Sequence, residues 1–380
     1  MSEELPENTN DLQQPTTVLL AEFEAKRQQL CEQMAASGLA AVQLQRTENI
    51  AWLTAGRVDR RVLLPSAFGI ATVLVLRNGE AFYLSPDNEA RRLAEEDFNG
   101  LPFTAITVPW HAPNFSAQIR SLAGDGRIAA DSEPEGALLL REQRSSLTPG
   151  EQERYRWLGR NTAQVTAQLL KTLQPGMTER AITARLAAAL WERGIEPSVL
   201  LIAADDRILR YKHAVAQDAT FQRFGMLNLC TRRWGLAISI TRFVHFGRMP
   251  QGLQDAFGVA AEVNARLLAA TKVSASAADL FRVTADSYAA LGHPGEELRH
   301  HQGGATGYGE REWLATPAGT ERVVNHQAFA WNPSVAGGKV EDTVLLRDGN
   351  IELLTRTPDL PLVSTRAGEL TIESAGVLVR

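Results

Sequence analysis

Polar side chains recur at alternating positions in two apolar segments of the second half of the chain, and their types suit acid–base chemistry. Successive side chains of a strand point to opposite faces, so Ser239 and His245 share one face and Lys339 and Glu341 share another. A histidine can accept or donate a proton near neutral pH, and a carboxylate can orient or balance it. The pattern predicts a polar site built from these four residues.

Strands and helices must position these side chains. Thr148 and Glu151 form a capping-box pattern that opens a helix reaching about Leu173, and Thr178 and Gly194 bracket a second helix. Runs of β-rich sequence follow on both sides of two helical stretches. Helices grouped between runs of strands indicate an α+β fold rather than a parallel doubly wound sheet. The expected strands lie at about 198–204, 224–231, 236–245, 326–332, 340–346 and 350–354, and two helical stretches are expected within about 251–290.

The first part of the chain has its own α/β pattern. An amphipathic helix is expected from Thr17 to Gly38, followed by a short strand. Asn78-Gly79 between two β-rich runs predicts a hairpin with a type I′ turn. The expected organisation is a flexible tail at 1–16, a first domain at 17–145 and a second domain at 146–380.

Composition limits the class of protein. A chain of 380 residues is long for one core, and 44% hydrophobic residues with a net charge of -5 favour packed domains without a nucleic-acid role. The polar start resembles no signal peptide, and no apolar run reaches about 18 residues, so we expect no membrane segment. Cys31 and Cys230 support neither a disulfide framework nor a thiolate zinc site, which fits a cytoplasmic protein.

Four fragments occur in a fixed order: PGMTE, ITRFVHFG, GGATGYGEREW and WNPSVAGGKVEDTVLLRDGNIELLT. Together they resemble the pita-bread family of creatinase, aminopeptidase P and prolidase. The likeness runs from about Thr17 to Thr355 and includes GLAAVQLQRTENIAWLTAG, which is similar to the creatinase-type N-terminal domain. The resemblance implies a pita-bread C-terminal domain, a smaller α/β N-terminal domain and a homodimer.

Metal-dependent members of this family hold a metal pair with two aspartates, one histidine and two glutamates. The resemblance places these positions at Asn228, Ser239, Gly304, Asn332 and Glu341, so only Glu341 is retained. A metal pair carries four positive charges, and neutral amide or hydroxyl groups would leave it under-neutralised and under-coordinated. We therefore expect no bound metal pair and no other cofactor.

The resemblance also suggests roles for other residues. Creatinase works without metal, and this likeness implies that His213 acts as general acid and base, with Glu341 and His300 as further catalytic residues. Each histidine could instead be structural, Lys339 could simply pair with Glu341, and Arg242 could bond a carbonyl or acidic neighbour. The candidate substrate-binding residues are Lys339, Arg311, Arg242, His245, His301, Ser239, Asn228 and Asn332.

The segment 56–61 is dense in charge. The resemblance implies that one of its arginines could reach the site of a partner subunit. A solvated charged turn is the alternative.

Three functions remain open. The first is a metal-independent, creatinase-like hydrolase of a C–N bond in a small anionic amidine, amide or peptide-like substrate. The second is a catalytically inactive, peptidase-like binding protein. The third is an ordinary Xaa-Pro aminopeptidase or dipeptidase, which the framework favours and the set of ligand residues opposes.

Overall fold

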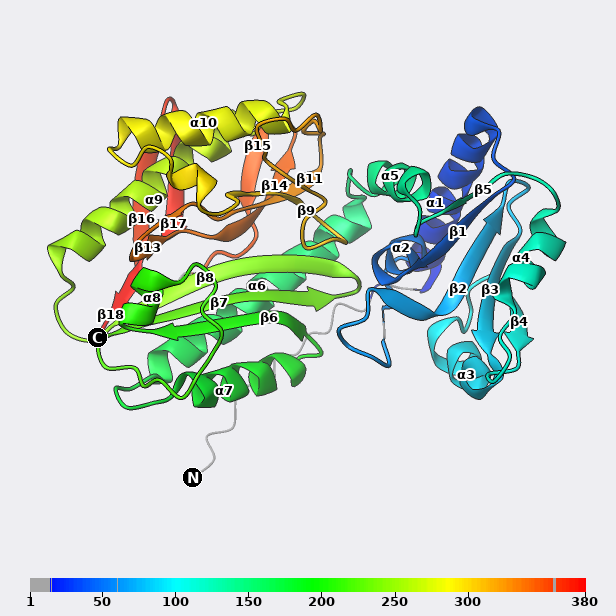
Figure 1. Cartoon of the computed structure of the whole chain (residues 1–380), viewed down its shortest axis with the longest axis horizontal. Coiled ribbons are helices and arrows are strands. Elements are labelled where there is room, and N and C mark those ends of the chain that lie inside the picture. Colours follow the sequence, from blue (N-terminus) through cyan, green and yellow to red (C-terminus); the bar gives the residue numbers. More distant parts are fainter. Residues whose placement is uncertain (1–13, 15, 60, 358–359) are drawn as a thin grey trace.

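The computed structural model describes residues 14, 16–59, 61–357 and 360–380, which form two lobes (Figure 1). Most of the tail expected at 1–16 therefore lies outside the described residues. The first lobe extends through residue 143 and the second starts at residue 149. The boundary proposed at 145 falls in the connection between them.

The first lobe is a mixed sheet with helices packed on it (Figure 1). Its strand order is β4-β3-β2-β1-β5, in which β3 pairs parallel with β4 and β1 pairs parallel with β5. The helices are α1 (Thr16–Ser37), α2 (Thr47–Leu53), α3 (Asp87–Arg92), which continues as a π-helix (Leu93–Asp97), α4 (Phe115–Ala123) and α5 (Pro134–Gln143). The strands are β1 (Ala41–Arg46), β2 (Phe68–Leu76), β3 (Ala81–Pro86), β4 (Thr104–Val108) and β5 (Ile128–Ala130).

The expected hairpin forms between β2 and β3, with Val75 opposite Ala81. The turn differs from the predicted type I′, which requires positive φ at both central residues. Gly79 has a φ of 93°, whereas Asn78 has no positive φ. One left-handed glycine is typical of a type I turn followed by a bulge, which the same two-residue sequence also permits.

The second lobe opens with two helices, α6 (Pro149–Thr172) and α7 (Glu179–Trp191). The predicted capping box is present: the Glu151 N–H donates to Thr148 Oγ1 at 3.2 Å, and the Thr148 N–H donates to Glu151 Oε2 at 2.7 Å. Thr178 caps α7 by accepting from the Ala181 N–H. These local signals fix where both helices begin.

Two sheets make up the body of the second lobe, with strand orders β18-β8-β7-β6 and β10-β9-β11-β14-β15. Helix α6 packs on the first sheet, α9 packs against β13 and β16, and α10 packs against α9 (Figure 1). The sequence pattern predicted no element beyond residue 354, yet β18 pairs parallel with β8, and β16 pairs with β17. The helices are α8 (Asp206–Arg210), α9 (Gln251–Ala270), α10 (Ala277–Ala290) and a 3₁₀ turn (Glu296–Leu298). The strands are β6 (Glu196–Ala204), β7 (Phe224–Arg233), β8 (Leu236–His245), β9 (Gly303–Thr306), β10 (Trp313–Leu314), β11 (Gln327–Trp331), β12 (Ser334–Val335), β13 (Gly338–Lys339), β14 (Asp342–Arg347), β15 (Asn350–Leu353), β16 (Leu362–Ala367), β17 (Leu370–Ala375) and β18 (Val377–Val379).

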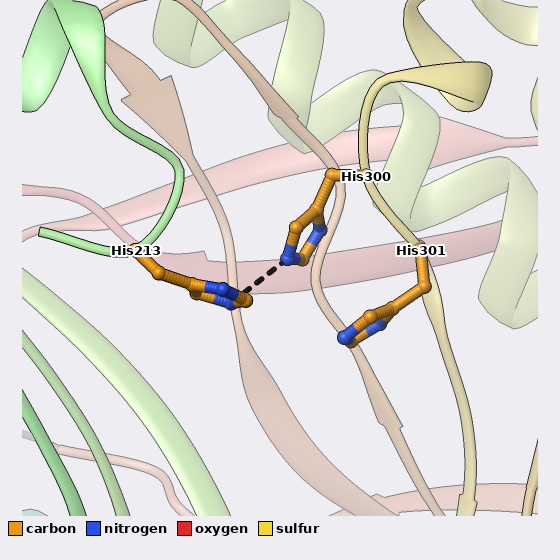
Figure 2. Close-up of side chains that lie close together, drawn as sticks. All are labelled: His213, His300 and His301. Atoms are coloured by element: carbon orange, nitrogen blue, oxygen red, sulfur yellow. Dashed lines mark hydrogen bonds between the residues drawn. The ribbon is translucent and has the colours of Figure 1, made fainter.

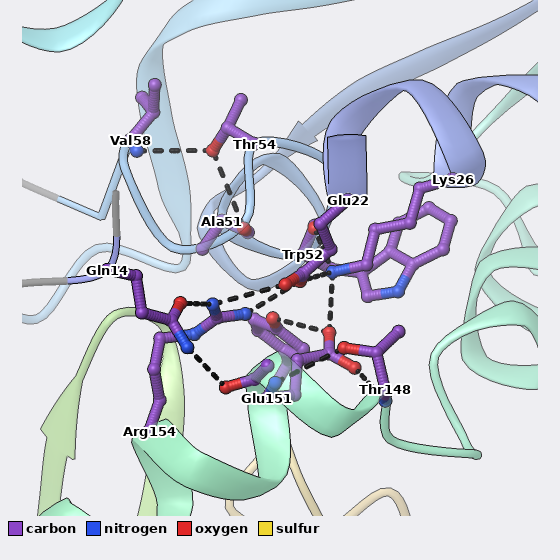
Figure 3. Close-up of polar contacts among 12 residues, drawn as sticks. Gln14, Glu22, Lys26, Ala51, Trp52, Thr54, Val58, Thr148, Glu151 and Arg154 are labelled. Atoms are coloured by element: carbon purple, nitrogen blue, oxygen red, sulfur yellow. Dashed lines mark hydrogen bonds and ion pairs between the residues drawn. The ribbon is translucent and has the colours of Figure 1, made fainter. Parts of the chain in front are cut away.

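A buried ionic network joins α1 of the first lobe to α6 of the second (Figure 3). Lys26 Nζ lies 2.7 Å from Glu22 Oε1, 2.6 Å from Glu151 Oε1 and 2.8 Å from the Trp52 carbonyl oxygen. Arg154 Nη2 contacts Glu22 Oε1 at 2.7 Å. Two cations therefore balance two carboxylates in a region from which water is excluded, so each charge depends on the others.

Replacing Lys26 tests how strongly this network holds the lobes. Lys26→Met leaves an excess negative charge on buried Glu22 and Glu151, so we expect the free energy of unfolding to fall by about 3–5 kcal/mol. Denaturant titration followed by circular dichroism measures the change. Arg91→Met, which removes an exposed Arg91–Glu95 pair, should cost less than about 1 kcal/mol. Equal losses in the two variants would contradict the proposed role of the network.

Candidate functional site

The carboxylate of Glu341 lies at the base of the candidate site, between β13 and β14. Its Oε2 atom accepts hydrogen bonds from Thr241 Oγ1 at 2.6 Å and from Asn228 Nδ2, and lies 3.0 Å from Lys339 Nζ. Its Oε1 atom lies 3.5 Å from Arg311 Nη2. Both carboxylate oxygens are thus engaged by donors that come from β7, β8, β13 and the loop after β9.

The surroundings of Glu341 keep it ionised. Burial alone would raise its pKa, but the charges of Lys339 and Arg311 and the hydrogen bond from Thr241 outweigh burial and lower the pKa to about 2. A buried carboxylate is stable in this form because paired cations and hydrogen bonds offset its lost hydration. Glu341 therefore carries a full negative charge at neutral pH.

Arg311 links Glu341 to the two central strands. Its Nη1 atom donates to Ser239 Oγ at 3.0 Å, and Ser239 Oγ lies 3.3 Å from Cys230 Sγ. Burial, and then the nearby Glu341 charge, raise the pKa of Cys230 to about 12, so the thiol is protonated at neutral pH. Cys230 was not predicted as a site residue, although it shares a strand face with Asn228, two residues earlier.

Two imidazoles face each other at the edge of the site, as Figure 2 shows. His213 Nε2 and His300 Nε2 lie 3.0 Å apart, and the ring of His301 lies beside that of His300, with centroids 4.2 Å apart. His213 belongs to the loop after α8, and the other two precede β9. The fold therefore brings together histidines that are 87 residues apart in sequence.

Burial and neighbouring cations keep these histidines neutral at pH 7. Burial lowers the pKa of His213, Lys339 lowers it further, and Glu341 opposes both. Burial, then the positive potential of His301 and Lys339, lowers the pKa of His300 to about 3. For His301, burial and then Arg311 lower the pKa to about 4. Each ring thus carries one N–H and one nitrogen with a lone pair.

A cavity of about 370 Å³ connects these groups. Lys339 and Arg311 line it together with the carboxylates of Glu341 and Glu310, so the formal charges of these four groups balance. Glu310 was not among the residues predicted for the site. Asn332 Oδ1 is buried with no hydrogen-bond partner among the described residues, which leaves an acceptor for a ligand. The remaining lining residues are Val199, Leu201, His213, Asn228, Cys230 and His301.

Arg242 and His245 lie away from this cavity, which departs from their expected role in substrate binding. Arg242 follows Thr241 in β8 and therefore points to the opposite face, where Nη2 contacts Asp342 Oδ1 at 2.6 Å and the Thr355 carbonyl oxygen at 2.7 Å. His245 lies at the end of β8, where its Nδ1 is 2.9 Å from the Gly247 carbonyl oxygen. Both side chains have structural partners instead.

The arginines of segment 56–61 are engaged within the chain where they are described. Arg61 pairs with Glu196 of β6, and Arg57 Nη2 donates to the Asn99 carbonyl oxygen. Arg60 lies outside the described residues. These contacts tie the segment to its own subunit.

The five positions expected for metal ligands do not fit a metal pair. A Cβ atom at Gly304 would lie only 2.0 Å from the Trp313 carbonyl oxygen, so the backbone leaves no space for an imidazole there. The amino group of Lys339 and the guanidinium of Arg311 already surround the one remaining carboxylate. Asn228 uses its amide N–H groups toward Thr241 and Glu341 and thus acts as a donor at this point. The positive charges next to Glu341 are therefore the side chains of Lys339 and Arg311.

The low pKa of Glu341 gives a stability test. The folded-state pKa of about 2 lies below the ordinary 4.5, so the carboxylate stabilises the fold above about pH 4.5 and this contribution, about 3 kcal/mol, is lost as the pH falls toward 2. Glu341→Gln should be less stable than wild type at pH 7 and should lose less stability between pH 5 and 3. Urea titration at each pH measures this, and parallel pH curves for the two proteins would rule out the charge as the cause.

Comparisons with known proteins place the fold. The family model described as metallopeptidase family M24 matches residues 153–348. No curated protein matches the chain in sequence. Among solved structures, the Xaa-Pro dipeptidase from Bacillus anthracis aligns with a TM-score of 0.71 at 13% identity, over 94% of this chain and 100% of that one.

Two further structures align over similar lengths. Dipeptidase PepE from Mycobacterium ulcerans has a TM-score of 0.74 at 16% identity, over 89% of this chain and 97% of that one. The N-terminal domain of FACT complex subunit SPT16 from Cicer arietinum (chickpea) has a TM-score of 0.66 at 10% identity, over 89% and 96%. At these identities the likeness concerns the fold, and it confirms the expected α+β, pita-bread architecture.

Proposed function

The chain belongs to metallopeptidase family M24, and we propose that it is a creatinase-like hydrolase that cleaves a C–N bond without the metal pair of that family. The proposed substrate is a small amidine, amide or peptide-like molecule that carries an acidic group. The observation that carries this proposal is the His213–His300 pair, whose Nε2 atoms lie 3.0 Å apart beside a cavity lined by Lys339, Arg311 and Glu341.

His213 is the proposed general base. Among the described residues, its ring has a hydrogen bond to His300 alone, so its second nitrogen remains available to water or substrate. Because burial and Lys339 lower the pKa of His213, the ring is neutral at pH 7 and can accept a proton. His300 holds the orientation of the His213 ring through the Nε2 contact.

The proposed reaction consumes one water molecule. The water oxygen attacks the carbon of the C–N bond while His213 takes a proton from that water. The C–N bond then breaks, and His213 returns the proton to the leaving nitrogen. No group other than water is needed to balance this hydrolysis.

The remaining polar groups of the cavity suit substrate binding. Lys339 carries three N–H donors and makes one contact with Glu341, so it can also donate to an acidic group of the substrate. The free Oδ1 of Asn332 can accept from an amide or amidine N–H. In this proposal Glu341 holds Lys339 and Arg311 in place and balances their charge rather than taking the proton.

One observation favours a binding protein without catalysis as the second candidate. Both oxygens of Glu341 are already occupied by Asn228, Thr241, Lys339 and Arg311, so this carboxylate is not free to orient a water molecule. Binding then uses the same cavity, and no bond is broken. A metal-dependent Xaa-Pro peptidase is the third candidate, and an assay with and without metal distinguishes it from the other two.

Replacement of His213 tests the hydrolase. Full-length protein treated with a chelator is assayed against carboxylate-bearing amidines, amides and Xaa-Pro dipeptides, with metal content measured by elemental analysis. We expect hydrolysis of one of these classes without added metal. His213→Ala should lower kcat/KM by about 100-fold to 10,000-fold, which is the usual contribution of a general base.

Two results would contradict the hydrolase proposal. Xaa-Pro cleavage that disappears with chelator and returns with added manganese would favour the metal-dependent peptidase. Binding of a substrate in calorimetry without turnover would favour the binding protein. His111→Ala is the matched control because His111 is exposed in the first lobe, and it should retain wild-type activity.

A further inference from the structure

The ring nitrogens of His213, His300 and His301 converge on one point at the edge of the cavity (Figure 2). One nitrogen from each ring lies within 4.8 Å of the other two, and the closest recorded contact is the 3.0 Å separation between the Nε2 atoms of His213 and His300. Two lone pairs cannot face each other at this distance without a proton or a cation between them. The cluster thus brings several possible ligand atoms to one place.

His300 adds a second unusual feature. Its Nδ1 atom is buried without a hydrogen-bond partner among the described residues. One neutral ring can donate a single N–H to the other, so the pair has no means of satisfying all four of its nitrogens internally. An ion bound by the ring lone pairs could replace the single hydrogen bond between the two rings, since imidazole is a common ligand for transition metals.

We propose that His213, His300 and His301 form a binding site for one divalent transition-metal ion of the Zn²⁺ class. This site is separate from the positions where the family holds its metal pair, because none of the three histidines occupies those positions. Three neutral nitrogen ligands with a fourth position open to the cavity match the ligand set that zinc has in sites where one position is left to water or substrate.

Ligation requires a small change in ring orientation. Zinc–nitrogen distances are about 2.0–2.1 Å, so two ligand nitrogens on one ion can be at most about 4.2 Å apart. The three ring nitrogens lie within 4.8 Å of one another, which is slightly more than this maximum of about 4.2 Å. His213 has an exposed side chain on a loop, so rotation of its ring can close the gap. The 3.0 Å contact needs only to lengthen toward the spacing of a tetrahedral pair.

The charges around the cluster permit a cation. Lys339 and Arg311 oppose it, and Glu341 and Glu310 of the same cavity favour it, so the formal charges of these lining groups cancel. At neutral pH the rings themselves carry no charge to repel an ion. The affinity should therefore be set by the nitrogen ligands rather than by the surrounding charge.

Metal binding at this site has a consequence that rests on the proposed function. An ion would use a lone pair of His213 that the proposed hydrolase needs for proton transfer. Zinc should then inhibit turnover instead of supporting it. The binding itself does not depend on catalysis, so it can be tested in the absence of substrate.

Calorimetric titration of the chelator-treated full chain with Zn²⁺ tests the site. We expect one ion per chain. His301→Asn should weaken the affinity by at least about 100-fold, because loss of even an outer partner of a ligand costs about 10- to 100-fold. His111→Asn, the same change at an exposed histidine of the first lobe, should bind as wild type does. Circular dichroism checks that each variant is folded.

Two results would overturn the proposal. The first is the absence of stoichiometric binding, or an affinity that is equal in wild type and His301→Asn. The second is binding of two ions whose affinity falls in Glu341→Gln and not in His301→Asn, which would assign the ions to the family positions. Zinc that binds through the histidines and activates hydrolysis would refute the metal-independent mechanism while leaving this site in place.

Discussion

The buried carboxylate of Glu341 is the constraint on which the rest of the site depends. Lys339 and Arg311 are only tolerable at this depth because Glu341 balances them, and Glu341 is only tolerable because they offset its lost hydration. Arg311 in turn reaches Ser239 of β8, so the charge pair fixes the loop after β9 against the central strands. The shape of the cavity follows from this arrangement.

The same constraint explains how Glu341 stays ionised at this depth. A buried carboxylate without a partner of opposite charge would be strongly destabilising. Here a lysine and an arginine contact it. Cations of the chain itself thus balance the buried acid.

Local signals in the sequence predicted much of the fold. The capping box at Thr148 and the hairpin at Gly79 depend on neighbouring residues, so both could be predicted. Long-range features could not be found in this way. Strand β18 exists because it pairs with β8, more than 130 residues earlier in the chain, and its own sequence has no strong pattern. Glu310 likewise lines the cavity because the fold brings it next to residues that are distant in sequence.

The position of Arg242 shows the limit of reasoning about a site from the types of its residues. A cation next to a site strand was assigned to the substrate, yet alternation along β8 turns it to the face opposite Thr241. Thr241 and Glu341 face the site, so the residues that follow them, Arg242 and Asp342, both face away from it. Applied to both segments, the same alternation would have predicted the Arg242–Asp342 pair. At Gly304 the backbone is the limit, because the Trp313 carbonyl oxygen occupies the space that a side chain would need. Restoring a single ligand residue would therefore not restore a metal pair: the main chain, and not only the side chains, has a shape that excludes the imidazole.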